Sequence, residues 1–71
     1  MSTSDWWRQY APQQRVSARH SEKDPWERGT VMYARCDAQV KRIAVRTHIQ
    51  DCMTGEYYII TVTDPANIKP T

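Results

Sequence analysis

Branched aliphatic side chains are concentrated in residues 30–63, and before Gly29 the chain offers one of them, Val16. An element of secondary structure needs such side chains on one face in order to bury that face in a core. The chain therefore divides near Gly29, and we predict one small domain over residues 1–71. Its expected parts are a helical or irregular segment (1–28), a β-meander (29–64) and a tail (65–71).

Three stretches of the central part have the composition of strands. Residues 30–36 are β-prone, residues 40–50 alternate over their second half, and residues 56–63 form the strongest strand pattern. Gly55 marks a hairpin turn between the last two. We therefore predict a meander of three antiparallel strands.

The alternation also assigns faces to the two later strands. A hairpin loop with an even number of residues places Ile49 opposite Ile60 and Thr47 opposite Val62, on a face that is buried. A helix over residues 37–50 is the alternative, because apolar side chains in that stretch also recur at helical spacing.

The amino-terminal part contains signals for short helices. Asp5 can cap a helical turn that runs through Tyr10, and residues 12–24 are either helical or disordered. Residues 24–29, "DPWERG", combine an N-cap, a proline and a glycine stop, which predict a further turn. The expected fold class is therefore α+β, with short N-terminal helical segments packed on a three-stranded antiparallel β-sheet.

The composition indicates a thin core. The chain has 71 residues, of which 39% are hydrophobic, and it lacks phenylalanine; its mean hydropathy is −0.80. A domain of this size buries only about 60% of the surface of its unfolded chain. Because a thin core and uncovered sheet edges both favour self-association, we predict a homo-oligomer, in the first place a homodimer.

The net charge and the first residues of the sequence indicate the cellular location. The net charge is +2 and the pI is about 8.7, a weaker basic character than that of a dedicated nucleic-acid domain. The first ten residues do not have the pattern of a secretory signal, and no apolar run is long enough to span a membrane. We therefore predict a cytoplasmic protein with reduced cysteines and no membrane partner.

Signals for metal binding and catalysis are weak. Cys36, Cys52, His20 and His48 are the thiols and imidazoles of the chain, and their spacing contains no C-x2-C pair of the kind that holds zinc. Only two glycines are present, which excludes a glycine-rich phosphate loop. We predict no metal, no cofactor and no enzymatic activity.

The segment "DWWRQY", residues 5–10, gathers aromatic surface close to the chain start. On a helical turn Trp6 and Tyr10 share a side, which we expect to cover the sheet, while Trp7 points about 100° away. Trp7 beside Arg8 is the combination enriched at binding hot spots. The first functional hypothesis is a non-enzymatic protein-binding module (a regulator, inhibitor or adaptor, of the kind found in phages and mobile elements) that uses Trp7, Arg8 and Tyr10.

The polar face of the predicted hairpin supports an alternative hypothesis. It carries Arg42, Arg46 and His48 together with Tyr57. Cations interleaved with an aromatic ring suit the phosphates and stacked bases of single-stranded nucleic acid. The alternative function is therefore a nucleic-acid-binding regulator that uses these four side chains.

Overall fold

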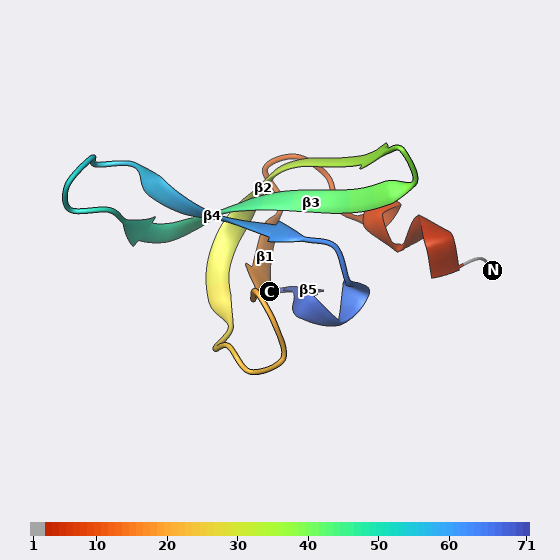
Figure 1. The fold of residues 1–71 in the computed structure, drawn as a ribbon, viewed down its shortest axis with the longest axis horizontal. Coiled ribbons are helices and arrows are strands. Elements are labelled where there is room, and N and C mark those ends of the chain that lie inside the picture. The colour runs from red at the N-terminus through yellow and green to blue at the C-terminus, as the bar shows by residue number, and fades with distance from the viewer. Residues whose placement is uncertain (1–2) are drawn as a thin grey trace.

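The computed structural model describes residues 3–71, whose strands form one five-stranded antiparallel sheet (Figure 1). The strands are β1 (Arg15–Ala18), β2 (Glu27–Asp37), β3 (Val40–Gln50), β4 (Tyr57–Val62) and β5 (Ile68–Pro70). Their order across the sheet is β4-β3-β2-β1-β5. The last strand thus pairs with the first, and β4 and β5 are the two edges. The fold is elongated, with extents of 43 × 23 × 21 Å.

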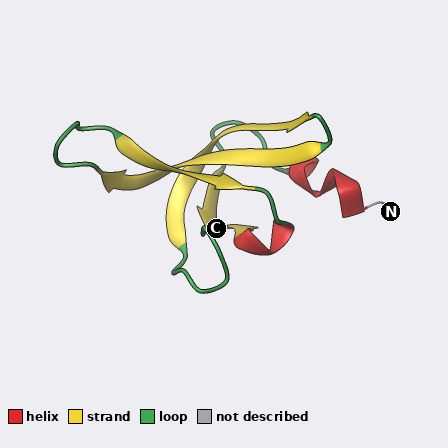
Figure 2. Ribbon diagram, viewed as in Figure 1, coloured by secondary structure: helices red, strands yellow, loops and turns green. Residues whose placement is uncertain are grey.

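The predicted α+β class is wrong, because the described residues are nearly all-β. Their helical content is two 3-10 turns, η1 (Thr3–Gln9) and η2 (Pro65–Asn67), shown in red in Figure 2. Even η1 is interrupted at Asp5, where φ is −103° and ψ is 16°. Segments this short gain too few hydrogen bonds to offset helix nucleation, so packing against the sheet determines their shape. The sheet has five strands, not the three predicted.

The two strands that the sequence analysis missed, β1 and β5, are four and three residues long. β1 lies within residues 12–24, so the expectation that this stretch is helical or disordered is wrong. Val16 pairs with Gly29 of β2 on one side and with Pro70 of β5 on the other. One buried valine cannot produce a recognisable alternation, which is why the pattern of β1 was too short to detect.

Residues 24–29 do not form the predicted capped turn, since β2 already begins at Glu27. The ring of Trp26 lies against two cations instead. The guanidinium carbon of Arg19 is 4.4 Å from the ring centroid and the ammonium nitrogen of Lys69 is 4.3 Å from it. Because Arg19 follows β1 and Lys69 belongs to β5, these cation–π contacts attach the β1–β2 loop to both strands.

The three strands of the predicted meander are present as β2, β3 and β4, and residues 40–50 form a strand, not a helix. β2 and β3 are joined by a two-residue turn in which Ala38 and Gln39 have φ values of 48° and 67°. Positive φ at both central positions is the geometry that matches the twist of a tight hairpin. These strands could be predicted because their stretches of β-prone and alternating residues are long.

The pairing of β3 with β4 differs from the predicted register by four residues. Ile60 lies opposite Val45 and Val62 lies opposite Ile43, whereas Ile49 and Thr47 were the expected partners. The shift is an even number, so Ile60 and Val62 still face the core as predicted. Ile49, in contrast, is 43% exposed.

Beyond Arg46 the β3–β4 ladder is irregular, and a buried hydroxyl replaces part of it. The Thr47 side chain, 2% exposed, donates a hydrogen bond to the carbonyl of Tyr58 at 2.9 Å. It also accepts one from the backbone N–H of Ile49 at 3.3 Å. This buried polar group is therefore satisfied.

The core lies on one face of the sheet. Its members are Tyr10, Val16, Ala18, Val31, Ile43, Val45, Ile60, Val62 and Ile68. Trp6 and Trp7 are half-buried and both pack against it. η1 therefore covers this face, as predicted for Trp6 and Tyr10. The prediction that Trp7 points away from the sheet is wrong, because its ring also packs against the core.

Gly29 of β2 allows β2 and β3 to approach each other closely. A Cβ added at Gly29 would lie 2.6 Å from the carbonyl oxygen of Arg46 and 2.7 Å from a methyl carbon of Val45. Both contacts are shorter than van der Waals separation. A glycine at this position therefore sets how tightly the two long strands can pack.

Candidate nucleic-acid interface

The face of the sheet opposite the core carries cations from three adjacent strands. Arg15 pairs with Thr30, and Thr30 pairs with Arg46, so the three side chains form one row across β1, β2 and β3. Arg28 lies two residues before Thr30 and His48 two residues after Arg46, and alternate residues of a strand point to one face. We call Arg15, Arg28, Arg46 and His48 the arginine face. All four side chains are exposed.

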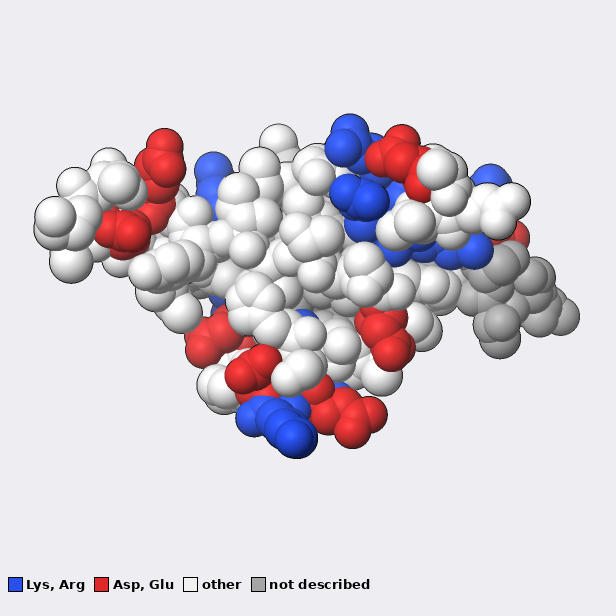
Figure 3. Space-filling view, in the orientation of Figure 1, with Lys and Arg blue, Asp and Glu red and all other residues white. Residues whose placement is uncertain are grey.

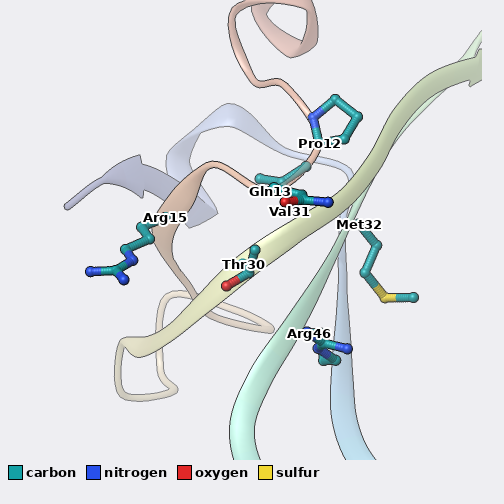
Figure 4. A pocket seen from close by; sticks show the side chains of 7 residues that line it. All are labelled: Pro12, Gln13, Arg15, Thr30, Val31, Met32 and Arg46. Carbon is teal, nitrogen blue, oxygen red and sulfur yellow. The ribbon is translucent and has the colours of Figure 1, made fainter.

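Two open grooves on the arginine face meet at Arg15 and Thr30. The first has a volume of about 510 Å³ and extends to Arg46; the second, of about 440 Å³, extends to Arg28 and His48. Figure 4 shows Arg15 and Arg46 on opposite sides of β2, with Thr30 between them. The second groove also reaches Thr71, the last residue of the sequence. Within the described chain, neither groove is lined by an Asp or Glu side chain. The charged side chains of both grooves are therefore arginines, which suit an anion.

Aromatic rings lie beside Arg46 of the arginine face and beside Arg35, further along β2. The guanidinium carbon of Arg46 lies 5.9 Å from the centroid of the Tyr57 ring, and that of Arg35 lies 4.5 Å from the centroid of Tyr33. Tyr57 is 47% exposed, so much of its surface is free. A cation next to an exposed ring can bind a phosphate and stack a base at neighbouring positions.

Three of the four residues predicted for nucleic-acid binding are brought together on this face, namely Arg46, His48 and Tyr57. Arg42 lies further along β3, opposite Arg35 of β2. It is half-buried, and its Nε has no hydrogen-bond partner among residues 3–71. Arg42 therefore extends the cationic surface toward the turn of the β2–β3 hairpin and does not line either groove.

Arg15, Arg28 and Thr30 were not predicted as site residues. Their strands are adjacent to β3 only because β1 exists and β2 starts at Glu27. The signal available was the alternation Arg15, Val16, Ser17, Ala18, in which two apolar residues are separated by a polar one. That pattern is too short to distinguish a strand from a loop.

The residues predicted to contact a protein partner lie elsewhere, on and after η1. Arg8 is exposed, forms an ion pair with Asp5 at 3.6 Å and lies 5.2 Å from the ring centroid of Trp7. Trp7 is half-buried, and its indole N–H is enclosed with no hydrogen-bond partner in the described part of the chain. Tyr10 is 6% exposed and belongs to the core. Burial raises the pKa of the Tyr10 hydroxyl.

Charge is separated along the molecule. Basic side chains gather at the far end of the β2–β3 hairpin, and acidic ones lie at the opposite tip, in the β3–β4 hairpin (Figure 3). The first group includes Arg35, Lys41 and Arg42, and the second includes Asp51 and Glu56. Arg35 also forms an ion pair with Asp37 at 2.8 Å.

The possible metal ligands are scattered. Cys36 is exposed near the turn of the β2–β3 hairpin, and Cys52 is exposed at the tip of the β3–β4 hairpin; both are free thiols. Residues 3–71 contain no group of three or more His, Cys, Asp or Glu side chains arranged to hold a metal ion. No helix in the same residues has the length and apolar character that crossing a membrane requires.

The arginine face thus combines exposed cationic side chains with an adjacent aromatic ring. Comparisons of the chain with protein-family models, with curated proteins and with solved structures found no significant match. The case for a function therefore rests on the side chains of this protein alone.

Proposed function

We propose that the protein binds single-stranded nucleic acid through the arginine face. The observation that carries the proposal is the row Arg15–Thr30–Arg46 across three strands, extended by Arg28 and His48, with no Asp or Glu side chain among the described residues of its grooves. Guanidinium groups bind phosphate oxygens in bidentate fashion. Grooves that follow such groups suit a flexible backbone better than a rigid duplex, and Tyr57 offers a ring for stacking.

The test is binding of a fluorescein-labelled single-stranded oligothymidine. The double variant Arg15→Gln/Arg46→Gln removes two phosphate contacts, so affinity should fall about tenfold or more at about 0.1 M salt. The slope of log K against log salt should decrease in magnitude by about 1.4, since each phosphate contact to a single strand contributes about 0.7.

The matched control is Arg8→Gln/Lys23→Gln, which loses the same charge from exposed positions outside the arginine face. It should bind nearly as well as the unmodified chain. Equal weakening by the two double variants would mean that net charge alone drives binding, and the proposal would be wrong.

A protein-binding role was the first hypothesis from the sequence. Its support at Trp7, Arg8 and Tyr10 is reduced by the burial of Tyr10 and the partial burial of Trp7. A different surface, the edge strand β4, supports a protein partner and is treated below. Homodimer formation, a cytoplasmic location and the absence of enzymatic activity stay predictions.

A further inference from the structure

The two edges of the sheet are built differently. β5 is a three-residue strand that contains Lys69 and Pro70, and short length, lysine and proline all hinder pairing with another strand. β4 is a six-residue strand, Tyr57–Val62, without a charged residue or a proline. Among the described strands it pairs with β3 alone. One edge is therefore protected, and the other is open to a further strand.

The hydrogen bonds of the hairpin show which residues of β4 face the open side. The carbonyls of Glu56 and Tyr58 both accept bonds from β3 or its loop, from the Asp51 N–H and the Thr47 hydroxyl. Successive residues of an antiparallel strand direct their backbone groups to opposite sides. The N–H and C=O of Ile59 consequently point to the open edge and are available to a partner strand.

An apolar groove lies beside this edge. It has a volume of about 180 Å³ and is formed by side chains of the β1–β2 loop, the start of β2, β3 and β4. These side chains are His20, Asp24, Pro25, Glu27, Thr47, Ile49, Tyr58 and Ile60. Ile49 and Tyr58 are 43% and 53% exposed. A strand added to β4 would direct alternate side chains to the same face of the sheet as Tyr58 and Ile60, so an apolar side chain there can reach the groove from its Tyr58 side.

Carboxylates surround the edge and the groove. Asp24 and Glu27 line the groove, Asp51 and Glu56 lie at the hairpin tip, and Asp64 follows the other end of β4. These are five of the chain's eight acidic residues. Acidic side chains border this part of the molecule in Figure 3 as well. A strand that docks here meets negative charge at both ends.

We propose that β4 binds an extended segment of a partner protein by strand addition. An apolar side chain of that segment enters the groove, and lysine or arginine at its two ends faces the carboxylates. A second copy of β4 fits less well, because antiparallel self-pairing would bring Glu56 close to Asp64 of the other copy at both ends. The proposal does not depend on nucleic-acid binding, which uses the opposite charge on another face.

The test uses the fluorescein-labelled peptide acetyl-Lys-Val-Thr-Ile-Thr-Val-Lys-amide, with binding followed by anisotropy. Saturable binding to the unmodified chain is expected. Ile59→Pro removes an N–H that points away from β3, so the sheet should be retained while peptide affinity falls about tenfold. Equal affinity for the variant, or no binding to the unmodified chain, would overturn the proposal.

A second pair of variants tests the charge and does not depend on folding of the proline variant. Glu27→Gln/Glu56→Gln should weaken binding several-fold, whereas Asp5→Asn, an exposed carboxylate on η1, should leave it unchanged. A peptide with glutamate at both ends should bind more weakly than the lysine peptide. Equal binding of the two peptides would refute the charge argument.

Sedimentation of the unmodified chain and of Ile59→Pro tests whether a second copy of β4, and not a partner protein, pairs with the open edge. A dimer that the proline variant abolishes would mean that β4 pairs with itself, and the strand-addition proposal for a basic partner would be wrong. The expected result is the same oligomeric state for both proteins, because self-association then uses a surface other than the β4 edge.

Discussion

The centre of the sheet and the β3–β4 hairpin tip use the same kinds of side chain in opposite ways. Ile43 and Val45 are fully buried at the centre, whereas Ile49, Ile59 and Met53 are 43%, 48% and 89% exposed. Apolar side chains at the centre hold the fold by burial. Those of the β3–β4 hairpin tip are largely exposed and contribute little to the core.

Hydrogen bonds, and not apolar burial, hold the backbone of the β3–β4 hairpin tip in place. The Asp51 N–H donates to the carbonyl of Glu56 at 2.7 Å, and the Gln50 side chain donates to the carbonyl of Gly55 at 2.6 Å. The Asp51 carboxylate accepts the N–H of Met53 at 2.7 Å. A region held in this way can change its exposed side chains without losing its backbone geometry.

The same substitution at the two places should give the sharpest contrast. Ile43→Ala leaves a cavity in the core and should lower the free energy of unfolding by about 2–5 kcal/mol. Ile59→Ala should change it by no more than about 0.5 kcal/mol, since half of that side chain is already in water. Urea denaturation measures both values. Similar losses at the two positions would mean that the β3–β4 hairpin tip belongs to the core.

A second comparison uses the two glycines. Gly29→Ala forces a methyl group against the β3 backbone and should cost about 1–3 kcal/mol. Gly55, in the hairpin loop, has a φ of 78°, and a Cβ added there would lie 3.7 Å from the Gln50 Nε2, an ordinary contact. Gly55→Ala should therefore cost about 1 kcal/mol from backbone strain alone. Melting curves of the two variants test the order. A larger loss for Gly55→Ala would show that the close approach of β2 and β3 can relax.

The smallest effect concerns pH. Burial raises the pKa of Tyr10 above the usual value of about 10, so the unfolded chain loses this proton at a lower pH than the folded one. The contribution to stability is full below about pH 10 and is lost as pH rises through the folded-state pKa. Tyr10→Phe should flatten part of the decline in melting temperature above pH 10. Tyr58→Phe, with Tyr10 intact, should retain the decline.

Long alternating stretches could be predicted from the sequence, and short ones could not. Residues 40–50 were placed as a strand because their apolar residues repeat over several positions. β1 and β5 have too few residues for any repeat, and they become strands because each finds a neighbour in the folded sheet. Pairing between residues 15–18 and 68–70 is a property of the tertiary fold that local patterns do not contain.

The residues of the candidate site could likewise be predicted only where their strands could. Arg46, His48 and Tyr57 lie on strands with a detectable pattern, whereas Arg15 and Arg28 depend on β1 and on the early start of β2. At Trp26, in contrast, a local pattern predicted an element that does not form. Its flanking aspartate and proline resemble a helix start, but contacts with Arg19 and Lys69 fix it in an extended loop. Cation–π contacts across distant segments override local capping signals.

The opposite charges at the two hairpin ends make the molecule an electric dipole along its 43 Å axis. A polyanion that comes within a Debye length, about 10 Å at 0.1 M salt, exerts a torque on this dipole before any contact forms. The basic end turns toward the polyanion and the acidic tip turns away. Encounter with nucleic acid should therefore be oriented in advance, and the acidic tip should remain directed at the solvent.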